Sequence, residues 1–139
     1  MTLSNTMTLS DEQATLLEVA TSFSREKASM SETRRQIASE TGFDRALWDE
    51  MAELGWLGIA VPEQFGGSGL SLAEVVTVVE PMGRYLAGSP FMSTQMFAQG
   101  VLTGGSEQLK KELLPQICRG AIGAVALFED EGDWDLTRI

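Results

Sequence analysis

Histidine is absent from this chain of 139 residues, and cysteine occurs once, as Cys118. Without histidine, Ser-His catalysis, Cys-His catalysis and imidazole-metal sites are excluded within the chain. A single cysteine excludes an internal disulfide and a thiolate metal cluster. Its place between Ile117 and Arg119 is typical of a small core residue rather than a nucleophile.

Basic residues are scarce as well, with ten Lys and Arg against twenty Asp and Glu, a net charge of −10. No basic patch is present to neutralise phosphates, which argues against a nucleic-acid partner. No apolar run approaches the roughly 18 residues of a membrane span. Residues 1–10 lack the basic start and apolar stretch of a secretion signal. We therefore expect a cytoplasmic protein with no membrane partner.

The hydrophobic content of 43% excludes a disordered tail, and the length suits one domain with a modest core. Capping boxes are expected at Ser10 with Gln13 and at Ser71 with Glu74, and Asp44 is expected to cap another helix. Apolar residues at helical spacing follow each cap and indicate the helices. They predict helices over residues 11–28, 44–54, 71–85, 91–102 and 106–119. The polar stretch from Ser29 to Thr41 is either a continuation of the first helix or an exposed linker.

Two prolines and five methionines fall within or beside these helices. Pro81 is expected to bend or end its helix, and Pro115 to split the last helix into two short turns. The methionines are interpreted as core packing rather than as a ligand surface; they are Met30, Met51, Met82, Met92 and Met96.

Two segments lack helical periodicity. Leu57–Val61 is predicted to be a short extended piece before a glycine-rich turn, and Ala121–Phe128 is predicted to be a strand. A single strand cannot make a sheet, so it would begin a β-domain or pair with another chain. We therefore predict a mainly all-α fold, a bundle of about five to six helices with one terminal β-strand.

Five residues with carboxylate side chains lie within residues 129–135. A calcium site is one interpretation, because Ca²⁺ takes oxygen ligands. The glycine and glutamate of an EF-hand are not at the required spacing, however. The interpretation we favour is a solvated acidic turn or a frayed end. No metal ligand and no catalytic residue is predicted from the residues alone.

The order of these pieces resembles the N-terminal helical domain of the acyl-CoA dehydrogenases, from Leu9 to about Leu127. The strongest part is Phe43–Arg84, which contains E-L-G, then G-I-x-V-P-E-x-x-G-G, then G-L-S before a long helix. Ser89-Pro90 and the run from Gly104 through Lys110 continue the family's order.

The resemblance implies a helical N-domain, a middle β-domain and a C-terminal helical bundle. Residues 1–8 would then be a flexible N-terminus, 9–120 the helical domain, and 121–139 the start of the β-domain or an acidic tail. Family members hold FAD between the last two domains, and a carboxylate of the C-terminal bundle is usually the base. No catalytic residue is therefore carried over to this chain.

The resemblance also places the end of the chain near the flavin. The family usually reads T-E-P-x-A-G-S-D after the first strand, where this chain has F-E-D-E-G-D-W-D. Phe128 stands in place of the threonine and cannot donate its hydroxyl hydrogen bond. The residues expected nearest the cofactor or substrate are Val125, Leu127, Phe128 and Trp134.

Three functions remain open on this basis. The first is the N-terminal domain of an acyl-CoA dehydrogenase-like flavoprotein, which helps to form the acyl-CoA pocket for FAD-dependent α,β-dehydrogenation of the thioester. The second is a non-catalytic interaction subunit that completes a partner acyl-CoA dehydrogenase. The third is a helical domain without a partner. The first two imply a homo- or hetero-oligomer.

Overall fold

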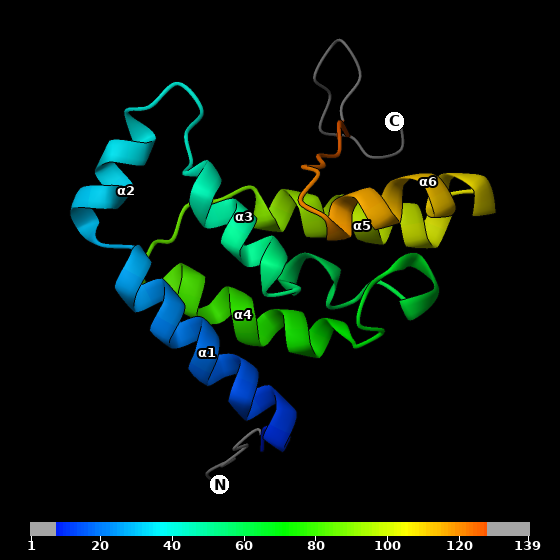
Figure 1. The fold of residues 1–139 in the computed structure, drawn as a ribbon, viewed down its shortest axis with the longest axis horizontal. Helices are drawn as coiled ribbons and strands as arrows, with labels where there is room; N and C mark the ends of the chain where they lie inside the picture. Colours follow the sequence, from blue (N-terminus) through cyan, green and yellow to red (C-terminus); the bar gives the residue numbers. More distant parts are fainter. Residues whose placement is uncertain (1–7, 128–139) are drawn as a thin grey trace, which may run out of the picture.

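The computed structural model describes residues 8–127, which form six α-helices (Figure 1). This confirms the helical fold class and the expected number of helices. The helices are α1 Asp11–Lys27, α2 Met30–Ile37, α3 Arg45–Glu53, α4 Leu72–Arg84, α5 Phe91–Gly104 and α6 Glu107–Cys118. Two short 3₁₀ helices, Trp56–Gly58 and Glu63–Phe65, lie between α3 and α4.

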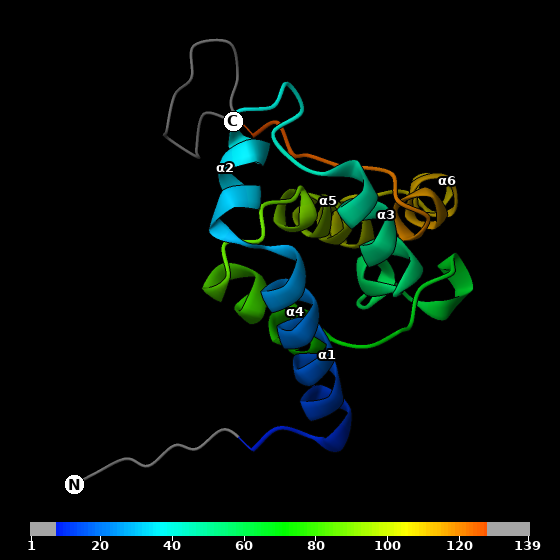
Figure 2. The same ribbon diagram turned by 60° about the vertical axis from the view of Figure 1, so that its left-hand side comes forward.

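Four of the six helices pack as two pairs, and the fold has two apolar clusters. Helices α1 and α4 lie side by side, and α5 and α6 form the second pair (Figures 1 and 2). Trp48, Met51 and Leu57 are fully buried in the first cluster, and Ala98 and Leu114 in the second. Burial of these large apolar side chains is the main favourable contribution to the fold.

Polar contacts join the beginnings of α1 and α4. The predicted capping boxes are both present, at Ser10 with Gln13 and at Ser71 with Glu74. The Gln13 Nε2 also donates to the Glu74 Oε1 at 2.8 Å, which links the two caps. These hydrogen bonds, chiefly from the Ser71 side chain and then from Gln13, lower the pKa of Glu74 to about 2 from its usual 4.5.

The pKa of Glu74 predicts an acid-sensitive contribution to stability. Because the folded-state pKa is depressed, the contribution is complete above pH 4.5 and is lost as the pH falls through about 2. Glu74→Gln should lower the urea midpoint at neutral pH, and the difference from the unmodified protein should vanish near pH 2. Glu112→Gln, at an exposed α6 position outside any ion pair of the described residues, is the control. Equal effects of both changes would contradict the role of Glu74.

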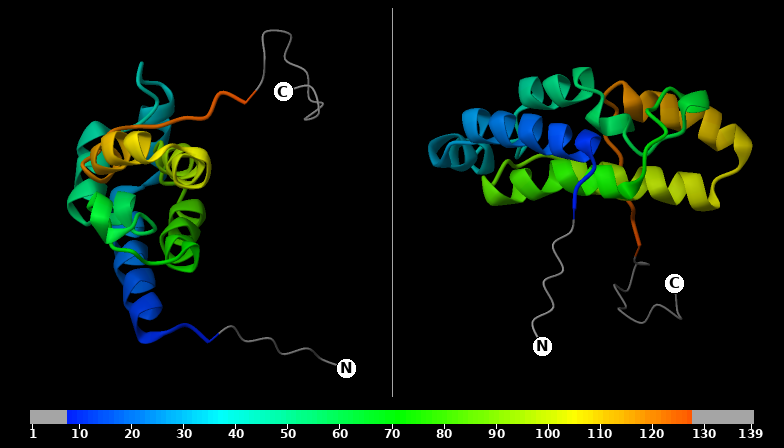
Figure 3. Two further views of the ribbon diagram at one scale, coloured as in Figure 1. Left: turned by 90° about the vertical axis from the view of Figure 1, so that its right-hand side faces the viewer. Right: turned by 90° about the horizontal axis from the view of Figure 1, so that it is seen from below.

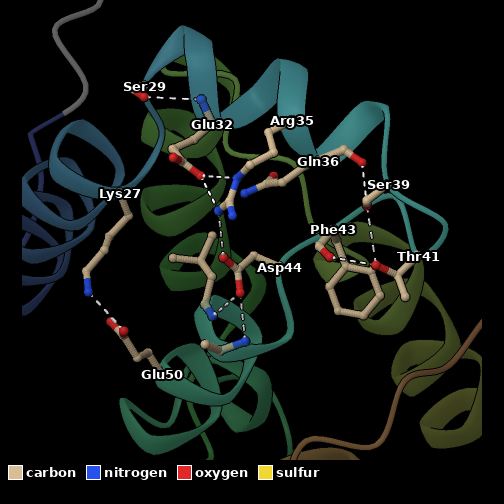
Figure 4. A network of polar contacts seen from close by, with 12 residues as sticks. Lys27, Ser29, Glu32, Arg35, Gln36, Ser39, Thr41, Phe43, Asp44 and Glu50 are labelled. Atoms are coloured by element: carbon tan, nitrogen blue, oxygen red, sulfur yellow. Dashed lines mark hydrogen bonds and ion pairs between the residues drawn. The ribbon is translucent and has the colours of Figure 1, made fainter.

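The stretch 29–41 is neither of the predicted alternatives, because it forms a separate helix, α2, and a turn (Figure 4). Ser29 accepts from the Glu32 backbone N–H at 3.2 Å and so begins a new helix after the break at Ala28. Arg35 pairs with Glu32 and lies 3.6 Å from the Asp44 carboxylate, which connects α2 to the cap of α3. Hydroxyl groups of the turn, at Ser39 and Thr41, donate to backbone carbonyls.

The prediction that Leu57–Val61 is extended is wrong. Gly55 has φ 76°, the left-handed region, and the chain then turns through the 3₁₀ helix Trp56–Gly58. The carbonyl of Gly58 accepts from both Val61 N and Ser68 N, at 3.1 and 2.9 Å, so the segment folds back on itself. Its apolar side chains are buried by this local folding and not by pairing in a sheet.

Pro81 does not end its helix and Pro115 does not split its helix, contrary to those two expectations. Pro81 lies inside α4, which continues to Arg84, and Pro115 lies inside α6, which continues to Cys118. Each stands in the last turn or near it, where a missing N–H removes one hydrogen bond and the remaining turn is short. Burial of Pro81 in the core further favours the continuous helix.

The prediction of a strand at 121–128 is also wrong for the residues that the structure describes. Residues 121–127 form no strand (Figure 3). The segment is held by side chains. Trp48 Nε1 donates to the Gly120 carbonyl at 2.8 Å, and Gly123 N donates to the Thr94 hydroxyl at 3.2 Å. No other strand is present among residues 8–127 to pair with it.

Candidate functional site

The surface between α4 and α5 is an open apolar groove of about 430 Å³, which we call the α4–α5 groove. Its side chains are almost all apolar, and no charged residue is among them. On the α4 side they are Leu72, Val75, Val76 and Val79; on the α5 side they are Met92, Gln95, Met96 and Gln99. Val76 and Met96 are each 61% exposed, although both are apolar. Contiguous exposed apolar surface of this kind marks binding sites for ligands or other protein segments.

The prediction that the five methionines pack in the core is only partly confirmed. Met51 and Met82 are core residues, as expected, but Met92 and Met96 are more than half exposed and line the groove. These two are four positions apart on α5, so they lie on one face of the helix. Helical spacing alone does not show whether an apolar face is covered by the same chain, which is why the exposure of Met92 and Met96 was not predicted. Met30 is also exposed, outside the groove.

A second apolar hollow adjoins the groove and shares Val79 and Met92 with it. It lies at the end of α4, where Leu86 has φ 55°, the left-handed region that non-glycine residues rarely adopt. The Thr33 hydroxyl donates to the Leu86 carbonyl at 3.2 Å and holds this turn. The side chains of Leu86 and Ile37, 54% and 75% exposed, extend the apolar surface.

The base of the groove is held in place by polar side chains of α5. Gln95 is 4% exposed, and its Nε2 donates to the Leu57 carbonyl at 3.1 Å. The neighbouring Thr94 is fully buried and contacts Gly123. Helix α5 is therefore fixed on one side to the loop after α3 and on the other to the segment 121–127.

Of the residues predicted near a cofactor, Val125 and Leu127 are described and are 49% and 46% exposed. Neither lines the α4–α5 groove. Phe128 and Trp134 lie outside the described residues, as does the acidic run 129–135. Val125 and Leu127 offer only apolar side chains, with no donor for a flavin ring or a pyrophosphate. The side chains at these two positions would therefore offer a flavin apolar contact only, and hydrogen bonds to it would come from elsewhere.

Three other features of the described residues concern metal binding, the reactivity of the thiol and membrane spans. Residues 8–127 contain no group of His, Cys, Asp and Glu side chains arranged to hold a metal ion. Burial raises the pKa of the Cys118 thiol, which disfavours the nucleophilic thiolate. No helix in the described range is both long enough and apolar enough to cross a membrane.

Comparisons with known proteins identify the helical unit. Residues 10–121 match the family described as "Acyl-CoA dehydrogenase, N-terminal domain". The chain is 32% identical over 126 residues to acyl-CoA dehydrogenase IpdE2 of Mycobacterium tuberculosis, which covers 89% of this chain and 39% of that protein. The chain thus spans well under half the length of this relative.

Two solved structures share the fold. The ChsE4-ChsE5 complex of M. tuberculosis matches with a TM-score of 0.80 and 27% identity, over 91% of this chain and 35% of that chain. An acyl-CoA dehydrogenase from Bacillus anthracis complexed with FAD matches with a TM-score of 0.77 and 25% identity, over 92% of this chain and 22% of that chain. On this evidence of sequence and fold, the chain belongs to the acyl-CoA dehydrogenase family and corresponds to its N-terminal helical domain.

Proposed function

We propose that this chain forms the N-terminal wall of the acyl-CoA pocket in an acyl-CoA dehydrogenase-type flavoenzyme. In that role it helps to bind the thioester whose acyl group undergoes FAD-dependent α,β-dehydrogenation. The observation that carries the proposal is the α4–α5 groove, an uncharged apolar surface left open in a chain of a family that acts on acyl-CoA.

The chemistry of the groove suits a hydrocarbon ligand. An acyl chain gains free energy from burial at about 25 cal/mol per Å² of apolar surface and needs no polar partner along its length. The unbranched side chains of Met92 and Met96 can adapt to different acyl shapes. The family's base lies outside this helical domain, so the groove would bind and orient the acyl group while other parts supply the reacting groups.

A carboxylate placed in the groove should prevent this binding. Met96→Glu is expected to weaken the binding of dodecanoyl-CoA to the chain by about tenfold or more, because an unpaired charge must lose its hydration against the acyl chain. Calorimetric titration measures the effect. Met30→Glu is the matched control, since Met30 is 53% exposed and lies outside the groove. Equal losses of affinity in the two variants would contradict an acyl site at the groove.

The flavin is proposed to be held mainly by the β-domain and C-terminal bundle of the parent enzyme or of a partner. Within this proposal the chain from residue 121 begins the β-domain. Val125, Leu127, Phe128 and Trp134 remain the proposed neighbours of the cofactor or substrate. FAD supplies the acceptor for the hydride in this chemistry.

A second candidate is a non-catalytic subunit that completes a partner acyl-CoA dehydrogenase. The likeness to a chain of the ChsE4-ChsE5 complex favours it. The two candidates differ in flavin content and partner. A colourless purified chain that co-elutes with a separate flavoprotein from the same organism supports the second. Flavin absorbance that stays with this polypeptide, or with a longer product of the same reading frame, supports the first.

A further inference from the structure

The base of the α4–α5 groove contains a buried acceptor atom. The side-chain oxygen of Gln95, Oε1, has no hydrogen-bond partner within the described structure. Gln95 lines the groove and yet is only 4% exposed, whereas Val76 and Met96 at the rim are each 61% exposed. Gln95 therefore lies at the bottom of a surface whose other lining side chains, apart from Gln99, are apolar.

The amide of Gln95 is fixed in orientation. Its Nε2 donates to the Leu57 carbonyl at 3.1 Å, which uses the donor end of the amide and leaves Oε1 as the free end. A buried acceptor without a partner is unfavourable by a free energy similar to that of a lost hydrogen bond, so its presence requires an explanation. A ligand that donates one hydrogen bond at the base of the groove would remove this penalty.

The surroundings of Gln95 limit what the donor can be. No charged side chain lines the groove, so an ammonium group would be buried without a counter-charge. A hydroxyl carries no charge and can donate a single hydrogen bond. Oε1 of Gln95 is covered in this structure. A hydroxyl would reach it when the flexible side chains of Met92 and Met96, which line the groove with Gln95, move aside.

We propose that the α4–α5 groove binds an acyl group that carries a hydroxyl, and that this hydroxyl donates to Oε1 of Gln95. The inference rests on the proposed function, because it names the class of acyl-CoA thioester that the same groove takes. Gln95 is then a specificity-determining residue that distinguishes hydroxylated from plain hydrocarbon acyl groups.

Binding of matched thioesters to the complete 139-residue chain tests the proposal. The ligands are dodecanoyl-CoA and three hydroxydodecanoyl-CoA thioesters, with the hydroxyl on the sixth, ninth or twelfth carbon. Dissociation constants are measured for the unmodified chain and for Gln95→Leu. For at least one hydroxyl position, the affinity relative to dodecanoyl-CoA should be about tenfold higher in the unmodified chain than in the variant.

Each protein is judged by the ratio of its dissociation constants for the two kinds of thioester. A general loss of affinity, caused by removing the hydrogen bond from Gln95 to Leu57, affects both constants and cancels in this ratio. The same ratio in both proteins at all three positions would overturn the hydroxyl inference and leave the acyl site standing. Failure of all four thioesters to bind the unmodified chain would overturn the proposed function and the inference together.

A spectroscopic measurement keeps the proposal testable if Gln95→Leu does not fold. In the ¹³C-labelled unmodified chain, the side-chain carbonyl of Gln95 should shift with a hydroxylated thioester and not with dodecanoyl-CoA. Gln99 lines the same groove and serves as the internal control, because it is not buried at the base. Shifts of equal size at both glutamines, or with both kinds of ligand, would contradict recognition of the hydroxyl by Gln95.

Discussion

Replacement of Gly67 by alanine is expected to destabilise the protein by about 3 kcal/mol or more. An alanine Cβ at this position would lie 2.1 Å from the Val61 carbonyl oxygen and 2.6 Å from the Gly58 carbonyl oxygen. Both are backbone atoms, which cannot move aside as the end of a side chain can. The same two carbonyls accept hydrogen bonds from Gly69 N and Ser68 N, so a shift of the loop would break these bonds too.

Gly100→Ala is the matched control for this prediction. Gly100 is exposed in the middle of α5, and a Cβ there meets no atom within 4 Å. Alanine favours a helix interior by up to about 1 kcal/mol relative to glycine, so this variant should be slightly more stable than the parent. Urea unfolding followed by circular dichroism measures both. A Gly67→Ala protein as stable as Gly100→Ala would show that the loop is not packed as described.

Trp48→Phe is expected to have the second-largest effect, a loss of about 3 kcal/mol. Trp48 is fully buried, and its Nε1 donates to the Gly120 carbonyl at 2.8 Å. Phenylalanine leaves that carbonyl without its donor and also leaves the space of the larger ring unfilled. Because Gly120 ends α6 with φ 103°, the lost bond also frees the start of the segment 121–127.

Trp56→Phe separates the hydrogen bond from the change in size. Trp56 is 2% exposed and packs edge-on against Phe23, with ring centroids 4.9 Å apart. The described structure shows no hydrogen bond from its indole, so this variant loses ring volume alone. The free energy of unfolding should fall by about 1–2 kcal/mol more for Trp48→Phe than for Trp56→Phe. Equal losses would mean that the bond to Gly120 does not stabilise the fold.

The helices could be predicted from sequence because their signals are local. Ser10 with Gln13 and Ser71 with Glu74 form the predicted capping boxes, and Asp44 caps α3 through the backbone N–H groups of Ala46 and Leu47. A cap depends only on residues within one turn, so no tertiary information is needed. The family resemblance, which rests on the order of such local motifs, is confirmed as well.

The wrong predictions concern segments whose conformation depends on distant contacts. Ala121–Leu127 has the composition of a strand, but Gly123 within it bonds to the Thr94 side chain, and Trp48 holds the Gly120 carbonyl just before it. Both side chains precede the segment by many residues. Leu57–Val61 is apolar enough for a strand, but its carbonyls instead accept hydrogen bonds from the backbone of the loop that follows, at residues 68–70. The pattern of apolar residues predicts that such residues are buried, but it does not predict which parts of the chain cover them.

The candidate site was missed for the same reason. Val76, Met92 and Met96 have the spacing of core residues on α4 and α5, and only the folded arrangement shows that no other described helix covers them. One feature of the sequence pointed to the site. Two polar residues, Gln95 and Gln99, interrupt an otherwise apolar helix face. A buried glutamine on such a face is uncommon and indicates either a structural hydrogen bond or a ligand contact.

The most direct test of the account is a methionine-methyl NMR spectrum of the chain, recorded during titration with dodecanoyl-CoA. We expect the methyl signals of Met92 and Met96 to shift together and to saturate. The signals of Met30, exposed outside the groove, and of Met51, fully buried in the core, should remain in place. Shifts at Met30 without shifts at Met92 and Met96, or no shift at saturating thioester, would contradict the assignment of the α4–α5 groove as the acyl wall.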